Sequence, residues 1–447
     1  MIPPRFSRAW WSGWCPVPTL RLAATVVAVA VVVLVVPVTV PWWGPAVVVA
    51  LVAAVDLVRA PAPWDVEVVR ELPAVIPLGG EDTLTWTARV PGRGRVRVAL
   101  ADELAPSLRA DRRRVQLDVP RDGRARAVTR LRPTRRGTFR PSAVTVRVTG
   151  PLGLVTRQAP RELPGELQVH PSFRSRDQAE LHLRRARLLT EGQRATRRRG
   201  EGTEFEALRD YVEGDAYRHV DWAATARAGR PIVRTHRSER NQQVLVLLDA
   251  GRVVAGTVEG VPRLDHGMDA TLALATVATR LGDRVGLVAF GARTRAVVPP
   301  RRDADQRRRL STAMHALEPE LAESGYRDAF RTTLSRFHRR ALLVLVTELA
   351  AEAVQETLLP ALPLVLRDHA VVVVSVRDPQ LTAWRDGGAA TTGDAYRAAA
   401  AAGLLAERER TTSLLRRLGV AVVDATPEDL AGAVVDAYLD VKLGGRL

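Results

Sequence analysis

One short stretch of the chain concentrates the side chains that could carry chemistry. Between Gly200 and Arg252, carboxylates and guanidiniums alternate closely, and a histidine lies among them. Carboxylates with a histidine are what a cation-assisted hydrolase uses as metal ligands or as general acid and base. The set that would fill these roles is Glu204, Asp215, His219 and Asp221. The same alternation of charge also suits a network of bidentate ion pairs, or a face on which a partner docks.

The spacing favours the structural or docking interpretation. No second histidine stands close to His219, because the next one, His236, is far along the chain, and ion-pair networks often mimic sites. We therefore predict a joint or partner-docking face whose framework is Glu204, Arg209, Asp215, Asp221, Trp222 and Arg227. The catalytic alternative requires Glu204, Asp215 and Asp221 to converge in one pocket.

The stretch also predicts its own local structure. Phe205, Leu208, Tyr211 and Val212 recur at helical spacing, which predicts a helix. The segment His219–Arg227 predicts a second helical turn with Trp222 pointing inward, and PIVRTH after it predicts a short strand.

The chain after this stretch, residues 243–447, has the pattern of an α/β domain. Near-continuous apolar runs are typical of strands buried on both faces of a parallel sheet. They fall at Val244–Asp249, Val285–Phe290, Ala341–Thr347, Ala370–Val376 and Val420–Asp424. Helical segments alternate with them, which predicts a doubly wound sheet. Ligands of such sheets bind beyond the carboxyl ends of the strands. This singles out Asp249 after the first run and Thr347 with Glu348 after the third.

A long ordered run of residues resembles a known family. The run GEGTEFEALRDYV, with EGD, RHVDW, ATAR and PIVR after it, leads into ERNQQVLVLLDAGR. It resembles a family known only as a domain of unknown function, whose members accompany MoxR-type AAA+ ATPases. The resemblance continues through LDHGMDATLALA and GDRVGLVAFG and covers essentially the whole chain. It implies a von Willebrand factor A-like domain and a MoxR-type ATPase as partner, but no established activity.

The resemblance also implies a place for a metal ion. Von Willebrand A-like domains that bind a metal begin the site with Asp-x-Ser-x-Ser, and such oxygen ligands suit Mg²⁺. Asp249 matches the aspartate, whereas Gly251 and Val253 replace both serines, and Glu348 stands where a later acidic ligand is expected. Asp249 and Glu348 would then form a degenerate site, with Mg²⁺ as the one cofactor implied. The alternative is a strand end whose aspartate caps a turn.

Two apolar runs near the N-terminus predict a membrane anchor. Leu22–Val40 carries no charge and is long enough to cross a hydrocarbon core of about 30 Å, and Trp42–Val58 is slightly shorter. Basic residues precede the first run and follow the second, but none lies in the turn between them. The positive-inside rule then predicts a transmembrane hairpin, 22–58, with the basic tail 1–21 and the bulk of the chain in the cytoplasm. A cleaved secretory signal is the competing interpretation.

Residues 65–172 change to period-two alternation. Runs such as DTLTWTARV, RVRVALADEL and SAVTVRVTG are separated by turns rich in Pro, Gly and Asp. This pattern predicts an antiparallel β-sandwich as a spacer, followed by a connector, 173–242, that contains the polar stretch. Asp56, near the end of the second apolar run, is predicted to lie at the membrane interface.

The charge and composition of the chain limit the kinds of partner that it is expected to bind. A net charge of +17 and a pI near 11.2 would suit nucleic acid or anionic lipid. A nucleic-acid surface interleaves aromatic with basic residues, but the spacer offers only Trp86 and Phe139, so we expect a lipid bilayer and no nucleic acid. The sequence has no GxxxxGK[ST], GxSxG or HExxH motif, so the chain is not itself the ATPase.

These observations predict a multidomain, membrane-anchored, cytoplasm-facing adaptor that presents its α/β domain to partner proteins. Two other classes remain open. One is a metal-assisted hydrolase built on the polar stretch. The other is a cell-surface adhesion protein, which would place the large domain outside the cell.

Overall fold

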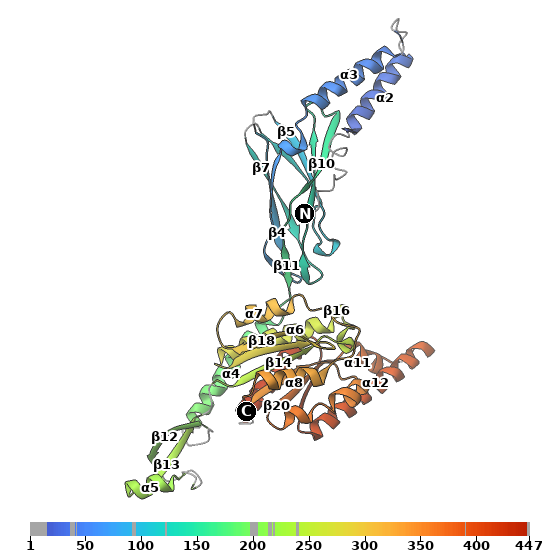
Figure 1. Cartoon of the computed structure of the whole chain (residues 1–447). Coiled ribbons are helices and arrows are strands. Elements are labelled where there is room, and N and C mark those ends of the chain that lie inside the picture. Colours follow the sequence, from blue (N-terminus) through green and yellow to red (C-terminus); the bar gives the residue numbers. More distant parts are fainter. Residues whose placement is uncertain are drawn as a thin grey trace, which may run out of the picture. The chain divides into compact units, whose positions relative to one another are not determined.

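The structure is a computed structural model that separates into two compact units, Met1–His170 and Pro171–Leu447 (Figure 1). It describes residues 16–35, 41, 43–91, 95–120, 123–196, 204–212, 217, 220–237, 241–388 and 390–444.

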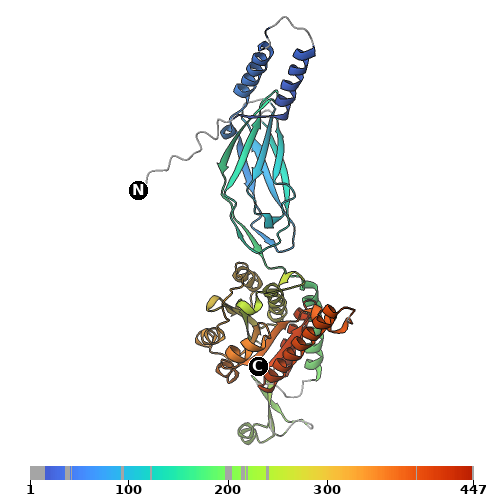
Figure 2. The same ribbon diagram turned by 90° about the vertical axis from the view of Figure 1, so that its right-hand side faces the viewer.

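Two apolar helices lie near the N-terminal end of the first unit. They are α2 (Leu20–Val35) and α3 (Gly44–Arg59), which lie side by side in both views (Figures 1 and 2). The helical segment Gly44–Asp65 is long and apolar enough to cross a membrane. Within the described residues α2 has 16 residues and is shorter than a full span. The structure thus shows one candidate span and one shorter apolar helix, and residues 36–40 of the first predicted span lie outside the described part.

The remainder of the first unit is a β domain of three sheets. Their strand orders are β1-β10-β9-β5-β6, β2-β4-β7 and β3-β11-β8. Its pairs are antiparallel except that β3 and β11 are parallel. The strands are β1 (Pro16–Pro18), β2 (Glu67–Glu71), β3 (Val75–Pro77), β4 (Asp82–Arg89), β5 (Val96–Asp102), β6 (Arg114–Val119), β7 (Arg124–Leu131), β8 (Gly137–Phe139), β9 (Ala143–Thr149), β10 (Val155–Glu162) and β11 (Leu167–His170).

Alternation along these strands builds the core of the β domain. In β6, residues Val115, Leu117 and Val119 are buried and their neighbours are exposed, as expected for a sheet with one wet face. Trp86 is the largest side chain of this core. Residues 16–18 of the predicted tail 1–21 form β1, which pairs with β10 and so belongs to this sheet.

The second unit is built on a six-stranded sheet with the order β18-β17-β14-β19-β20-β21. Five of its strands are parallel, and the edge strand β18 is antiparallel to β17. The bounds are β14 (Gln243–Asp249), β17 (Arg284–Phe290), β18 (Thr294–Arg301), β19 (Ala341–Val346), β20 (Ala370–Val376) and β21 (Ala421–Ala425). The sequence did not predict β18, because its two consecutive prolines are tolerated only where a strand lies at an edge.

Helices cover both faces of this sheet. One buried apolar cluster joins it to α4, α6, α7 and α13, and another joins it to α8, to the helical segment around α9 and α10, and to α12. This gives the three layers expected of an α/β domain. The helices are α4 (Arg176–Thr196), α6 (Arg263–Arg280), α7 (Gln306–Met314), α8 (Tyr326–Arg336), α9 (Ala351–Ala353), α10 (Pro363–Leu366), α11 (Pro379–Asp386), α12 (Thr392–Arg417) and α13 (Leu430–Leu443).

The polar stretch forms a small β-hairpin, and its predicted first helix is wrong. Strand β12 (Glu204–Asp210) pairs antiparallel with β13 (Ile232–Arg237), and α5 (Trp222–Ala228) lies between them in the chain (Figure 1). Short apolar runs fit helix and strand periods almost equally well. Pairing with the β-branched residues of β13 decides for the strand here, because strand preference depends on the neighbouring strand.

Candidate functional site

The order of the large sheet reverses between β14 and β19. Strands β17 and β18 extend the sheet on one side of β14, and β19, β20 and β21 extend it on the other. Ligands of open α/β sheets bind beyond the carboxyl ends of the strands at such a reversal. Asp249 ends β14, and Thr347 and Glu348 follow β19 directly. The candidate site is therefore this carboxyl edge.

Asp249 lies at the centre of a group of hydroxyls. Ser324 Oγ donates to both carboxylate oxygens, at 2.7 and 2.8 Å, and Thr347 Oγ1 donates to Oδ2 at 2.6 Å. Tyr326 OH lies 3.2 Å from Oδ2 and 2.8 Å from Thr347 Oγ1. The backbone N–H of Gly251 donates to Oδ1 at 2.8 Å. The carboxylate is fully buried and has a donor on each oxygen.

The protonation of this group is set by two opposing effects. Burial raises the pKa of the Asp249 carboxyl above its ordinary value, because it penalises the charged form, while the four surrounding hydrogen bonds act in the opposite direction. Burial, together with the neighbouring Asp249 charge, raises the pKa of Tyr326 as well. Tyr326 therefore stays a neutral hydrogen-bond donor. No histidine bonds to this group in the part of the chain that the structure describes, and the one ionisable group that the Ser324 and Thr347 hydroxyls contact as donors is the Asp249 carboxylate.

Glu348 belongs to a second polar group, one that contains two arginines. Arg263 Nη1 lies 2.6 Å from Glu348 Oε2, and Arg408 pairs with the other oxygen. Arg408 also reaches Asp424 at 2.7 Å and donates to Ser375 Oγ at 2.9 Å. Burial alone lowers the pKa of Arg408, but its bonds with Asp424 and the charge of Glu348 outweigh burial and raise it. Two carboxylates and two guanidiniums thus neutralise one another across β19, β20, β21, α6 and α12.

The residues at this edge do not fit a metal ion. Asp249 is engaged by hydroxyl and amide donors of the chain, and Glu348 is engaged by two guanidiniums. Mg²⁺ keeps several waters and takes one or two free carboxylates from a protein, but both carboxylates here already bond to the chain's own donors, and Gly251 and Val253 offer no side-chain oxygen. Across the described ranges, no group of three or more His, Cys, Asp or Glu residues could hold a metal. We derive no chemical step through a metal ion.

The residues predicted from the polar stretch lie on the hairpin and in α5. Asp221 is the N-cap of α5 and accepts from Ala224 N at 3.0 Å. Trp222 is 68% exposed, so its predicted inward orientation is wrong. The cap makes Trp222 the first residue of the helix, and Ala224 is the residue that α5 buries. Arg227 donates to Ala223 O at 3.2 Å.

The other predicted residues of this stretch are only partly described. Arg209 donates to Asp210 O at 3.0 Å, and the Asp210 carboxylate pairs with Arg230 at 3.0 Å. The backbone of Glu204 begins β12, whereas Asp215 and His219 lie outside the described residues. The described contacts are a helix cap, backbone bonds and an exposed ion pair, none of which forms a catalytic pocket.

Several residues of the carboxyl edge escaped the sequence analysis. Thr347 was not among them, because the end of the apolar run Ala341–Thr347 had already pointed to it and to Glu348. Ser324, Tyr326, Arg263 and Arg408 come from loops and helices between the strands, and no spacing in the sequence links them to Asp249 or Glu348. Only the folded sheet brings them there.

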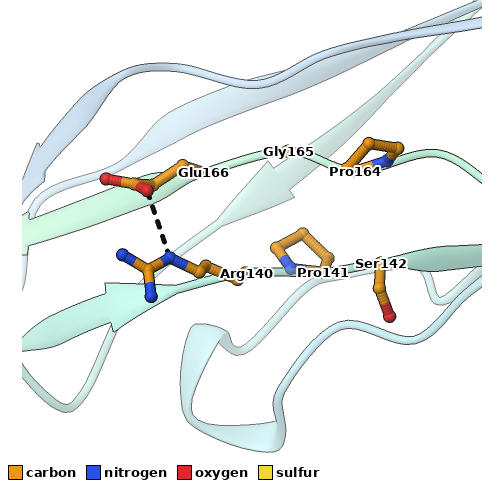
Figure 3. A pocket seen from close by; sticks show the side chains of 6 residues that line it. All are labelled: Arg140, Pro141, Ser142, Pro164, Gly165 and Glu166. Atoms are coloured by element: carbon orange, nitrogen blue, oxygen red, sulfur yellow. Dashed lines mark hydrogen bonds and ion pairs between the residues drawn. The ribbon is translucent and has the colours of Figure 1, made fainter. Parts of the chain in front are cut away.

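The first unit contains a separate surface hollow of about 400 Å³. Residues 140–142 form one wall and residues 164–166 form the other (Figure 3). Among the residues that line the hollow, one ion pair joins Arg140 Nε to Glu166 Oε2 at 3.1 Å, and both side chains are exposed to solvent. The hollow therefore presents no free charge and no reactive pair of groups.

Comparison with known proteins adds a partial family match. Residues 207–402 match the model of a family described as protein of unknown function DUF58. The match begins within β12 and includes Asp249 and Glu348, whereas Arg408 and Asp424 of the second polar group lie beyond its end. No curated protein matches the chain.

Two solved structures show distant likeness. The conserved hypothetical protein BatB from Bacteroides thetaiotaomicron is 12% identical, with a TM-score of 0.27, over 44% of this chain and 99% of that one. The proximal thread matrix protein 1 from the mussel byssus is 12% identical, with a TM-score of 0.25, over 46% of each chain. Neither likeness is close enough to indicate a function.

Proposed function

We propose that this protein is a membrane-anchored adaptor whose α/β domain faces the cytoplasm and is presented to a protein partner. The observation that carries the proposal is the direct bonding of the apolar helices to the β domain. Asp56, near the end of α3, accepts three backbone N–H bonds from the turn between β9 and β10. A folded domain is thus attached at the base of a helix long enough to span a bilayer.

The carboxyl edge of the large sheet supports recognition over catalysis. What supports this is that its carboxylates are already bonded by this chain's own hydroxyls and guanidiniums. The order of the sheet, with five parallel strands and an antiparallel edge, is consistent with the von Willebrand A-like domain that the sequence resemblance implies.

The partner that we propose is a MoxR-type AAA+ ATPase, on the basis of that resemblance. The hairpin segment exposes aromatic side chains for such contact, because Trp222 and Tyr217 are 68% and 74% exposed. Tryptophan and tyrosine are enriched among residues that dominate binding energy. A two-stranded hairpin is also marginally stable alone, so a bound partner would order it.

A binding measurement tests whether a MoxR-type ATPase is the partner. The full chain in nanodiscs is mixed with a purified MoxR-type ATPase from the same cell, in ATP and in ADP. We expect binding in at least one nucleotide state, and a loss of about tenfold in affinity for Trp222→Ala, since such anchors contribute 1–2 kcal/mol or more. Trp384→Ala in α11, where the ring is 43% exposed, is the matched control and should bind normally. Absence of binding in both states would refute this partner.

Thiol labelling tests the orientation. Cys15 is the one cysteine of the chain and precedes α2. A membrane-impermeant maleimide should leave it unlabelled in intact cells and label it after permeabilisation. In a Cys15→Ser background, Trp43→Cys at the start of α3 should label from outside. The reverse pattern would place the large domain outside, as an adhesion protein requires.

A further inference from the structure

The turn between β9 and β10, residues 150–155, is held by both apolar helices. Asp56 Oδ1 accepts from Leu152 N at 2.7 Å, and Oδ2 accepts from Leu154 N and Val155 N at 2.8 and 3.0 Å. Thr19, just before α2, donates its hydroxyl to Gly153 O at 2.7 Å and its N–H to Leu154 O at 3.1 Å. Asp56 is fully buried and holds the turn to the end of α3, and its predicted place at the membrane interface stays a prediction.

Two glycines make this close approach possible. A Cβ on Gly150 would lie 2.5 Å from the Asp56 carboxylate, which leaves no room for a side chain. Gly153 has a φ of 75°, which glycine adopts readily, and a Cβ there would lie 3.1 Å from Arg21 Nη1. The turn and the starts and ends of the helices are therefore fixed together, and the side chains around them occupy defined places.

We name the five basic, aromatic and apolar side chains near this turn the collar: Arg21, Arg59, Trp64, Leu152 and Arg157. Trp64 and Leu152 are 55% and 52% exposed, and Arg21 and Arg59 are exposed too. The Arg157 guanidinium lies 5.6 Å from the Trp64 ring centre and donates to Ala60 O at 3.3 Å. Within the described residues, none of these three arginines pairs with a carboxylate.

We propose that the collar binds the phosphates of anionic phospholipid headgroups. The proposal rests on the membrane anchor proposed above. Three arginines without acidic partners supply the charge, and they lie where the apolar surface of α2 and α3 ends, at the depth of the headgroups. Tryptophan favours that depth, and juxtamembrane arginines are attracted to anionic leaflets. Trp64 and Leu152 would enter the interface beside them, so the β domain would rest on the membrane surface.

Lipid selectivity of the full chain tests the collar. In nanodiscs of mixed phosphatidylglycerol and phosphatidylcholine, spin-labelled lipids report which headgroup is enriched next to the protein. We expect wild-type protein to favour phosphatidylglycerol, and the variant Arg21→Gln/Arg59→Gln/Arg157→Gln to reduce that preference by about tenfold. Inorganic phosphate at matched ionic strength should not abolish it.

The control variant removes three positive charges at a place on the β domain away from the collar. The control residues are Arg112, Arg113 and Arg114, which are exposed and lie beside the Asp102 end of β5. The turn between β9 and β10 lies at the opposite end of β5, because it follows Thr149, which pairs with Arg97. Their replacement by glutamine should leave the preference intact. No preference in the wild type, equal loss in both triple variants, or displacement by free phosphate would overturn the collar. Extraction of the wild type from membranes by alkaline carbonate would instead overturn the anchor.

Discussion

The hydroxyl of Ser324 lies 2.7 and 2.8 Å from the two carboxylate oxygens of Asp249, although 75 positions separate the residues. Gly251 is what allows this contact. A Cβ on Gly251 would lie 2.3 Å from Ser324 Oγ and 3.2 Å from Asp249 Oδ1. A hydroxyl from a distant loop therefore fills the space beside the strand end, and the small residue two positions after the aspartate is a requirement of packing.

Gly251→Ser should accordingly destabilise the α/β domain. We expect a loss of about 1–3 kcal/mol in the free energy of unfolding, the usual cost of an overpacked interior, measured by urea titration of the detergent-solubilised chain. Gly256→Ser is the control, because a Cβ there meets only Arg263 Nε at 3.7 Å. Adding Ser324→Ala to Gly251→Ser should recover part of the loss. Full additivity of the two changes would show that they do not compete for one space.

The strands of the large sheet could be predicted from sequence much better than its site. Near-continuous apolar runs such as 244–249 and 341–347 report burial on both faces, and both became central strands. Asp249 and Glu348 were found because they end or follow such runs. Their partners were not, since Ser324 and Arg408 reach them through tertiary contacts that leave no periodic trace. The hairpin of the polar stretch was missed for a related reason. Segment 204–210 is a strand and not a helix because it pairs with β13, and that contact is tertiary.

The Asp249 carboxyl should make the stability of the α/β domain depend on pH. Burial raises its pKa in the folded state above the ordinary value of a carboxyl, so the folded state holds this proton more tightly than the unfolded state does. The resulting stabilisation is present at low pH and is lost as pH rises through the folded pKa. Relative to Asp249→Asn, the free energy of unfolding of the wild type should fall as the pH rises from the acidic range, where the carboxyl is protonated in both states, through its raised folded pKa. Urea titrations across that interval measure the difference, and parallel curves would contradict the assignment.

Arg408 should be the most sensitive residue of the second polar group. It bonds Glu348, Asp424 and Ser375 with its side chain 11% exposed. Arg408→Gln leaves buried carboxylates without their main cation, and breaking a buried pair in this way costs about 3–5 kcal/mol. Thermal unfolding should show a large drop in melting temperature. Arg410→Gln, two positions along α12 and exposed, should change it little. Equal small effects would mean that the Arg408 network is not a source of stability.

Asp56 should control how firmly the β domain is joined to the apolar helices. Asp56→Asn keeps the shape of the side chain but removes the charge and replaces one acceptor oxygen with an NH₂ group, which cannot accept from Leu152, Leu154 and Val155 together. Hydrogen bonds to a charged group contribute about 1.5–3 kcal/mol, so the amides of the turn should exchange with deuterium at least about tenfold faster in nanodiscs. Asp82→Asn, which removes an exposed carboxylate bonded to Thr83 N, should leave that turn unchanged. If turn exchange is the same in wild type and Asp56→Asn, the helices are held to the β domain by other contacts, and Thr19 becomes the residue to change next.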